Sequence, residues 1–217
     1  MTHFDFSVYL VTDTRLCGGP AGVLDTVRRA VAGGVTAVQV RDPLASTREL
    51  VELSRAVLGV LRGSGVPLIV NDRADVALAV GADGLHVGQR DLDPVSARRL
   101  IGPTMHLGLS VSTPGDLTAA SDLPVGTLDL LGVGPIRDTP SKVDASPAMG
   151  FSGLARICRD SPLPCVGIGG LQLEDVTALK SAGAVGMAVI SAICGRPDPE
   201  AATRELVSAW ASTSEPA

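Results

Sequence analysis

Eight short apolar segments recur along this 217-residue chain, and polar residues follow most of them at once. The segments are Val8–Thr12, Val35–Val40, Pro67–Val70, Gly84–Val87, His106–Leu109, Leu128–Leu131, Pro164–Val166 and Val185–Ala188. Most of the stretches between them have helical spacing, as in Thr47–Leu61, which follows a candidate capping residue, Ser46. Eight such βα units in about 200 residues predict an α/β fold, a single closed (β/α)8 TIM barrel.

The predicted barrel accounts for the whole chain as one domain, residues 1–217, with the barrel core from about residue 7 to 211. Apolar residues make up 45% of the chain and aromatic residues only 2%, so the core is expected to consist of Val, Leu, Ile and Ala. The other predicted helices are Val23–Ala32, Ala74–Val80, one starting at Asp93-Pro94, Pro114–Ala120, Leu154–Cys158, Glu174–Ala182 and Pro199–Ala211.

Charge and composition exclude several classes of partner. The net charge is −5 and no Lys/Arg run exists, so a nucleic acid is not expected to bind. No apolar run reaches the length of a membrane span, about 18 residues, and no signal peptide precedes the first strand, so a cytoplasmic protein is expected. The four cysteines form no CxxC pair and are interpreted as small core residues. Whether the chain forms a homo-oligomer stays open.

Gln39 and Arg41 stand two residues apart at the end of an apolar segment, so both side chains are expected to face one way, into the barrel mouth. A Gln and an Arg buried there would be costly unless they bind a ligand. The alternative is a surface turn pair. His86 lies within Gly84–Val87 and is interpreted as a hydrogen-bonded core residue.

Asn71 and Asp72 follow the third apolar segment, and Asp91 follows the fourth. Two carboxylates from neighbouring strands suit Mg²⁺, which usually takes one or two carboxylates and completes its ligand set with water and phosphate oxygens. The alternative is helix N-capping, by Asp72 before Arg73–Val80 and by Asp91 or Asp93 before Pro94.

Two regions near the C-terminal half have the composition of phosphate sites. The long polar segment from Gly132 to about Gly150 contains Thr139, Ser141 and Lys142, whose hydroxyls and ammonium suit a phosphate or pyrophosphate. Gly167-x-Gly169-Gly170 and Ile190-Ser191 follow the last two strands, where barrels commonly bind phosphate through backbone N–H groups. The alternatives are a solvated loop and glycines that serve close packing.

With these residues in place, the chain resembles the thiamine-phosphate synthase family. The matching segments are Tyr9–Asp13, Gly33–Arg41, Val70–Arg73, Gly84–Asp91, Gly108–Ser110, Gly132–Ile136, Thr139–Lys142, Val166–Gly170 and Ile190–Ile193. The resemblance implies a transferase of thiamine biosynthesis. Such enzymes join hydroxymethylpyrimidine diphosphate to a thiazole phosphate and release pyrophosphate, through a dissociative route that needs no protein nucleophile.

The resemblance also implies a role for each matching residue. Asp72 and Asp91 would bind Mg²⁺ as the cofactor. The pyrimidine diphosphate would contact Gln39, Arg41, Asn71, Ser110 and Lys142, of which Arg41, Lys142 and Ser110 would assist the reaction directly. The thiazole phosphate would contact Thr139, Ser141, Gly170, Ile190 and Ser191. Both partners are therefore expected to be small phosphorylated molecules.

Two positions depart from the family pattern. Pro43 stands where the family usually has Lys, and Ser112 where it often has His. One cationic contact to the diphosphate is therefore missing, unless Arg90 or Arg137 replaces it. Two alternatives stay open: a thiazole tautomerase-like relative that binds only a thiazole phosphate, and a catalytically weak paralogue that binds thiamine phosphate. The first would not need Asp72, Asp91 and Lys142 together; Pro43 is the only support for the second.

Overall fold

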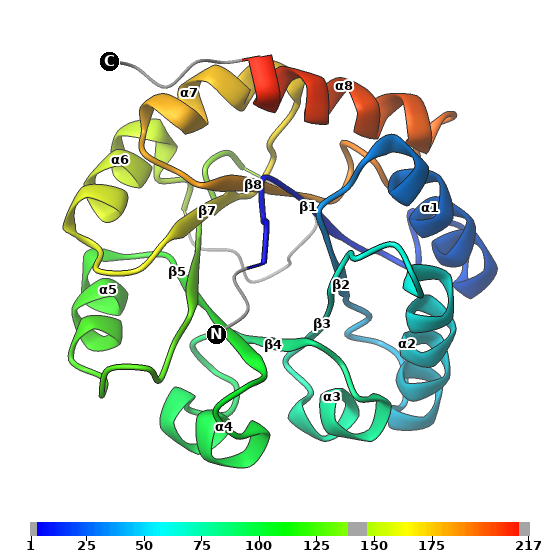
Figure 1. The fold of residues 1–217 in the computed structure, drawn as a ribbon. Helices are drawn as coiled ribbons and strands as arrows, with labels where there is room; N and C mark the ends of the chain where they lie inside the picture. Colours follow the sequence, from blue (N-terminus) through cyan, green and yellow to red (C-terminus); the bar gives the residue numbers. More distant parts are fainter. Residues whose placement is uncertain (1–3, 139–146, 213–217) are drawn as a thin grey trace.

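The computed structural model describes residues 4–138 and 147–212, which form a closed barrel of eight parallel strands inside a ring of helices (Figure 1). The strands pair in chain order, and β8 closes on β1. They are β1 (Val8–Val11), β2 (Ala37–Val40), β3 (Leu68–Asn71), β4 (Gly84–Val87), β5 (His106–Val111), β6 (Leu130–Val133), β7 (Cys165–Ile168) and β8 (Gly186–Val189). The (β/α)8 barrel predicted from the sequence is confirmed.

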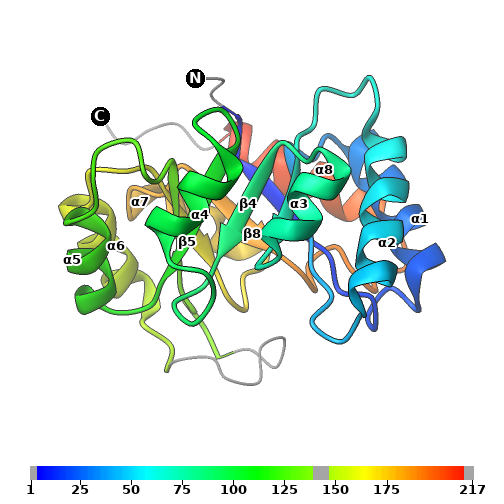
Figure 2. The ribbon, with the colours of Figure 1, turned by 90° about the horizontal axis from the view of Figure 1, so that it is seen from below.

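The helices alternate with the strands and cover the outside of the barrel (Figures 1 and 2). They are α1 (Pro20–Gly33), α2 (Thr47–Leu61), α3 (Ala74–Val80), α4 (Pro94–Ile101), α5 (Pro114–Ser121), α6 (Gly150–Asp160), α7 (Val176–Ser181) and α8 (Pro199–Ser212), with a 3₁₀ helix η1 (Leu173–Asp175) before α7. In the described parts of the chain, no helix is long and apolar enough to cross a membrane.

Capping residues mark the first turn of two of these helices, α2 and α4. Ser46 and Glu49 form a capping box at the start of α2, with the Ser46 N–H donating to Glu49 Oε2 over 2.8 Å. The Asp93 side chain accepts from the Ser96 N–H over 2.9 Å and caps α4, whose first residue is Pro94. Both helices therefore begin where the sequence predicts.

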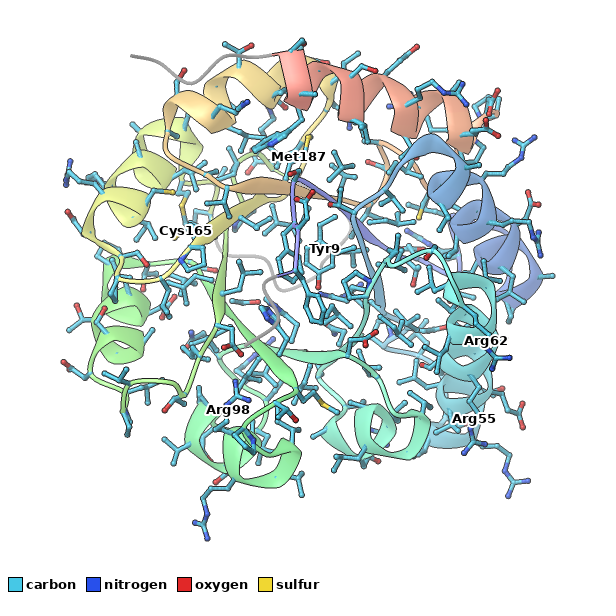
Figure 3. The ribbon with its side chains drawn as sticks, in the orientation of Figure 1. Tyr9, Arg55, Arg62, Arg98, Cys165 and Met187 are labelled. Carbon is cyan, nitrogen blue, oxygen red and sulfur yellow. The ribbon has the colours of Figure 1, made fainter. Side chains whose placement is uncertain are left out.

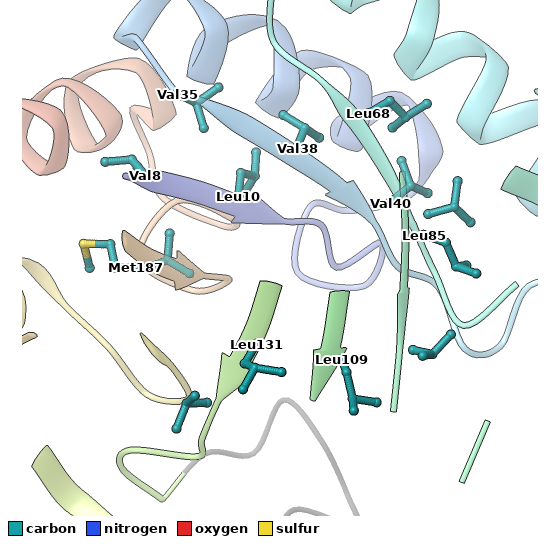
Figure 4. Packing of buried hydrophobic residues seen from close by; sticks show 14 of the residues in the cluster. Val8, Leu10, Val35, Val38, Val40, Leu68, Leu85, Leu109, Leu131 and Met187 are labelled. Carbon is teal, nitrogen blue, oxygen red and sulfur yellow. The ribbon is translucent and has the colours of Figure 1, made fainter. Parts of the chain in front are cut away.

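Strand residues alternate between two apolar layers, because successive side chains of a strand point to opposite faces. Val8, Leu10, Val38 and Val40 are fully buried and face the surrounding helices (Figure 4). Inside the barrel lies a smaller cluster, formed by Phe6, Tyr9, Val11, Ala37, Ile69, Leu130, Val166 and Ala188. The inward-facing set therefore includes Gln39, as the spacing of Gln39 and Arg41 predicts.

Aromatic side chains close the N-terminal end of the barrel. The segment before β1 crosses the barrel axis (Figure 1) and brings Phe6 within 4.9 Å of the His106 ring and 5.1 Å of the Tyr9 ring, measured between centroids. Phe4 lies 5.8 Å from His106. Burial among these rings lowers the pKa of His106 to about 4. Aromatic packing therefore closes this end of the barrel.

The sixth strand begins two residues later than predicted, at Leu130 rather than Leu128. The charged residue Asp129 interrupts the apolar segment just before the strand begins. Its Oδ2 atom accepts from Arg98 Nη2 over 2.6 Å and from the Leu107 N–H over 2.8 Å (Figure 3 labels Arg98). These two bonds join α4 and the start of β5 to the residue that precedes β6. The following helix is longer than predicted, Gly150–Asp160 rather than Leu154–Cys158.

The four cysteines are free thiols, as predicted, with Cys165 and Cys194 buried and Cys17 and Cys158 partly buried. Cys17 lies beside Cys194, and Cys158 lies beside Cys165, two pairs that the sequence does not reveal. The neighbouring Cys194 thiol lowers the pKa of Cys17.

Candidate active site

A cavity of about 150 Å³ opens at the carboxyl ends of the strands, where barrel enzymes place their chemistry. Every strand contributes to its wall, including Tyr9 from β1 and Asn71 from β3. The lining contains seven of the residues that the sequence predicts for the site: Gln39, Arg41, Asn71, Ser110, Gly170, Ile190 and Ser191. The structure thus brings together residues that lie up to about 150 positions apart in the chain.

Gln39 and Tyr9 form the floor of this cavity. The Gln39 side chain is 4% exposed, and its Nε2 atom donates to the Tyr9 hydroxyl over 2.7 Å (Figure 3 shows Tyr9 inside the barrel). Burial raises the pKa of Tyr9, so its hydroxyl stays protonated. The interpretation of Gln39 as part of a surface turn is therefore wrong. Arg41, two residues on, lines the same cavity.

His86 and Ser110 form a second polar pair on the wall. The His86 Nε2 atom lies 3.0 Å from Ser110 Oγ. Gly108 and Gly132 make room for the imidazole, because a Cβ atom would lie 2.4 Å from His86 Nδ1 at Gly108 and 2.9 Å from His86 Cε1 at Gly132. His86 is hydrogen-bonded, as predicted, but it lines the cavity rather than the apolar core.

Asp72 and Asp91 lie at the same end of the barrel, beyond the residues that line the cavity. They follow the neighbouring strands β3 and β4, and the Asp72 N–H donates to the His86 carbonyl over 2.7 Å. Asp91 Oδ2 accepts the Gly88 N–H over 2.8 Å. The capping alternative is confirmed for Asp93, which caps α4 before Pro94. The N-cap of α3 is Arg73, so neither Asp72 nor Asp91 occupies an N-cap position.

The backbone of Asp72 is unusual. Its φ angle of 60° is left-handed, and among the described residues no other position apart from glycines has a positive φ. This conformation costs about 1–2 kcal/mol in a residue with a Cβ, though Asp tolerates it better than most. Such strain persists where the surrounding structure requires it, often at functional sites. Here it turns the chain sharply between β3 and α3.

The donor chemistry at Asp72 and Asp91 suits a hydrated Mg²⁺ ion. No group of three or more His, Cys, Asp or Glu side chains that could hold a metal occurs in the ranges that the structure describes. A metal with a full protein ligand set is therefore not supported there. Mg²⁺ needs only one or two carboxylates when water and substrate phosphate oxygens complete its octahedron.

The two glycines after β7 pack against the loop that follows β6. A Cβ atom on Gly169 would lie 2.6 Å from Pro135 Cα, and one on Gly170 would lie 2.8 Å from Arg137 Cβ. Their φ angles are 101° and 68°, which residues with a Cβ rarely adopt. The close-packing explanation of these glycines therefore holds. It is compatible with phosphate binding, because Gly169 and Gly170 also line the cavity.

Thr139, Ser141 and Lys142 lie outside the described residues, so their predicted contacts remain predictions. Arg137 does not replace the cation missing at Pro43. Its guanidinium donates twice to Asp175, from Nη2 to Oδ1 over 2.5 Å and from Nε to Oδ2 over 3.2 Å. That carboxylate raises the pKa of Arg137 further and directs the side chain to η1.

Tyr9 and His86 are polar residues of the cavity wall that the sequence analysis does not assign to the site. The signal that would have found them is the two-residue alternation within strands. Tyr9 lies two positions before Val11 on the inward face of β1, and His86 lies two positions after the inward-facing Gly84. Applied to every strand, as it was to Gln39 and Arg41, the alternation predicts both.

Comparison with known proteins identifies the family of this chain. The model of the family described as thiamine monophosphate synthase matches residues 8–193. The thiamine-phosphate synthase of Azorhizobium caulinodans is 52% identical over 207 residues, covering 95% of this chain and 96% of its relative. The chain belongs to the thiamine-phosphate synthase family. The family and the class of enzyme predicted from the sequence are thereby confirmed.

Further relatives extend the agreement to the structure. The thiamine-phosphate synthase of Xanthobacter autotrophicus is 50% identical over 206 residues, with 95% of this chain and 96% of the relative covered. The solved thiamine phosphate pyrophosphorylase from Pyrococcus furiosus superposes with a TM-score of 0.86 at 32% identity, covering 96% of this chain and 97% of that one. A 3-hexulose-6-phosphate synthase at 19% identity and a TM-score of 0.71 shares the fold alone.

Proposed function

We propose that this protein transfers the pyrimidine-methyl group of hydroxymethylpyrimidine diphosphate to the ring nitrogen of a thiazole phosphate, giving thiamine phosphate and pyrophosphate. In this reaction the C–O bond to the diphosphate breaks and its electron pair leaves with the pyrophosphate. A C–N bond to the thiazole then forms. The observation that carries the proposal is the cavity wall, which combines the predicted residues of both substrates in one family member.

The wall supplies what a dissociative route requires. Arg41 places a fixed positive charge at the cavity rim, where it would stabilise the departing pyrophosphate. Gln39 and Asn71 offer amide groups that can orient the pyrimidine. The apolar side chains of Val166, Ile168 and Leu130 limit the water that reaches the methyl cation. No protein nucleophile is needed, and His86 with Ser110 serves to orient the substrate.

We propose that Asp72 and Asp91 hold Mg²⁺ together with the diphosphate. When bound, the ion neutralises negative charge on the leaving group. Lys142 adds a further cation in this proposal, and Ser110 a hydroxyl. The thiazole phosphate is assigned to Gly170, Ile190 and Ser191 with Thr139 and Ser141. We also place the reaction in the cytoplasm, since the relatives are biosynthetic enzymes.

A coupled assay for pyrophosphate tests this function. The purified protein is mixed with both substrates and Mg²⁺, and the release of pyrophosphate and thiamine phosphate is followed together. Equal amounts of the two products, lost on chelation with EDTA and restored by Mg²⁺, are expected. Absence of pyrophosphate at high enzyme concentration would contradict the proposal. Isomerisation of the thiazole phosphate alone would then favour the tautomerase-like alternative.

A further inference from the structure

Two arginines outside the cavity join the three loops around its β6–β8 side. Arg137 follows β6, η1 follows β7, and Arg196 follows β8. Arg137 binds Asp175 through both Nε and Nη2. Arg196 donates from Nη2 to Gln172 Oε1 over 2.6 Å and from Nε to the Ser191 carbonyl over 3.0 Å. Both arginines therefore converge on the short turn Gln172–Asp175.

The turn itself connects the two arginines. The Gln172 N–H donates to Asp175 Oδ2 over 3.0 Å, so one residue binds Arg196 and the other binds Arg137. The Arg137 N–H in turn donates to the Gly169 carbonyl over 3.0 Å. A continuous path of hydrogen bonds thus runs from Ser191 through the turn to Gly169.

This network differs from an ordinary surface ion pair in its burial. The Asp175 side chain is 2% exposed, while that of Arg137 is 51% exposed. A buried carboxylate needs its charged and N–H partners, because leaving it unpaired is costly. The buried Asp175 carboxylate therefore holds the Arg137 guanidinium in place, although half of the Arg137 side chain is exposed. Bidentate geometry adds directional control that a lysine cannot supply.

We propose that Arg137 and Arg196 are positioning residues for the thiazole phosphate, which hold the loops of Gly170 and Ser191 at the spacing that a phosphate requires. This inference rests on the proposed assignment of that phosphate to Gly170, Ile190 and Ser191. Backbone N–H groups bind phosphate only when several converge on it. A displacement of about 1 Å is enough to reduce binding and catalysis strongly. Neither arginine needs to touch the substrate.

The test compares Arg137→Gln and Arg196→Gln with a matched control, Arg159→Gln. Arg159 also pairs with an aspartate, Asp160, but on the outer helix α6 away from these loops. We expect each loop variant to raise KM for the thiazole phosphate about tenfold, the loss typical of one charge-assisted hydrogen bond. KM for the pyrimidine diphosphate and the values for the control should stay within about twofold of the wild type.

Two further variants separate positioning from long-range charge. Arg137→Lys keeps the charge but loses the bidentate contact, so its KM for the thiazole phosphate should remain raised. The same rise should persist at about 0.5 M salt, which screens distant charges. Restoration by Lys together with loss of the effect in salt would overturn the inference. So would an equal rise in KM for both substrates.

Ser191→Ala tests the underlying assignment separately. If Ser191→Ala raises KM for the thiazole phosphate while the arginine variants do not, the assignment stands and the positioning role is wrong. If neither Ser191→Ala nor the arginine variants change that KM, the positioning role is wrong and the Ser191 hydroxyl does not contact the phosphate. Thermal unfolding within a few degrees of the wild type shows that each variant is folded. Should Arg137→Gln fail to fold, Arg196→Gln and Arg137→Lys still decide the outcome.

Discussion

The two ends of the barrel are built from the same strands but have opposite character. At the N-terminal end, Phe4, Phe6 and His106 pack ring against ring, and the His106 Nε2 atom is buried with no hydrogen-bond partner in the described part of the chain. At the C-terminal end, polar side chains and glycines surround an open cavity. Tyr9 lies between the two, with its ring against Phe6 and its hydroxyl on Gln39.

The N-terminal end of the barrel therefore mainly stabilises the fold, while the C-terminal end carries the groups proposed for the reaction. The closed end contributes buried apolar surface, which favours folding without any contact to substrate. The open end contains strained and polar groups, such as Asp72 with its φ of 60°, whose cost is offset elsewhere in the fold. Substitutions at the two ends should therefore affect different measurements.

The largest effect is expected at the closed end, from Phe6→Ala. Phe6 is 6% exposed, and removing a buried aromatic ring typically costs about 3–5 kcal/mol through lost burial and the cavity left behind. Urea unfolding should show this loss, while kcat and both KM values stay near those of the wild type. Leu44→Ala, at a side chain 93% exposed, is the control and should change stability by less than about 0.5 kcal/mol. A selective loss of activity in folded Phe6→Ala would contradict the separation.

At the open end, Arg41→Ala should reduce kcat/KM by about 10²–10³, because one preorganised group that stabilises developing charge contributes on that scale. Its thermal midpoint should move by only a few degrees, since Arg41 faces the cavity rather than the core. Steady-state kinetics and a thermal melt check both parts. Unchanged kcat/KM would remove Arg41 from the proposed mechanism.

His106→Phe tests the closed end through pH. The pKa of His106 is about 4 in the folded protein and about 6.5 when unfolded, so the unfolded state binds more protons between these values. Wild-type stability should therefore fall by about 3 kcal/mol as the pH drops from 6.5 to 4. In His106→Phe this part of the decline should disappear. Urea unfolding at several pH values gives the slope, and an unchanged slope would contradict burial of a neutral His106.

The smallest effect is expected from Pro43→Lys. This variant places a cation where the family usually has one, two residues after Arg41 in the same loop. An added exposed charge near a diphosphate should lower KM for the pyrimidine substrate by about threefold at low salt, and less at high salt. Kinetics at two ionic strengths measure it. An unchanged KM would show that another group already compensates.

The sequence predicts local features of the barrel better than contacts between distant segments. Strand positions, the Ser46 and Asp93 caps and the inward-facing Gln39 follow from local periodicity and capping chemistry, which the sequence shows directly. The aromatic closure is a contact between residues about 100 positions apart, and no local pattern predicts it. Arg137 illustrates the same limit: the sequence suggests a cation for the diphosphate, but the fold pairs it with Asp175.

The most direct test of the account is a crystal structure with Mn²⁺, as a substitute for Mg²⁺, and both substrates or their products. We expect an anomalous Mn²⁺ peak between Asp72 and Asp91, with the diphosphate extending toward Arg41. We also expect the second phosphate at Gly170 and Ser191. Metal and diphosphate bound away from these carboxylates, or both phosphates bound outside the cavity, would contradict it.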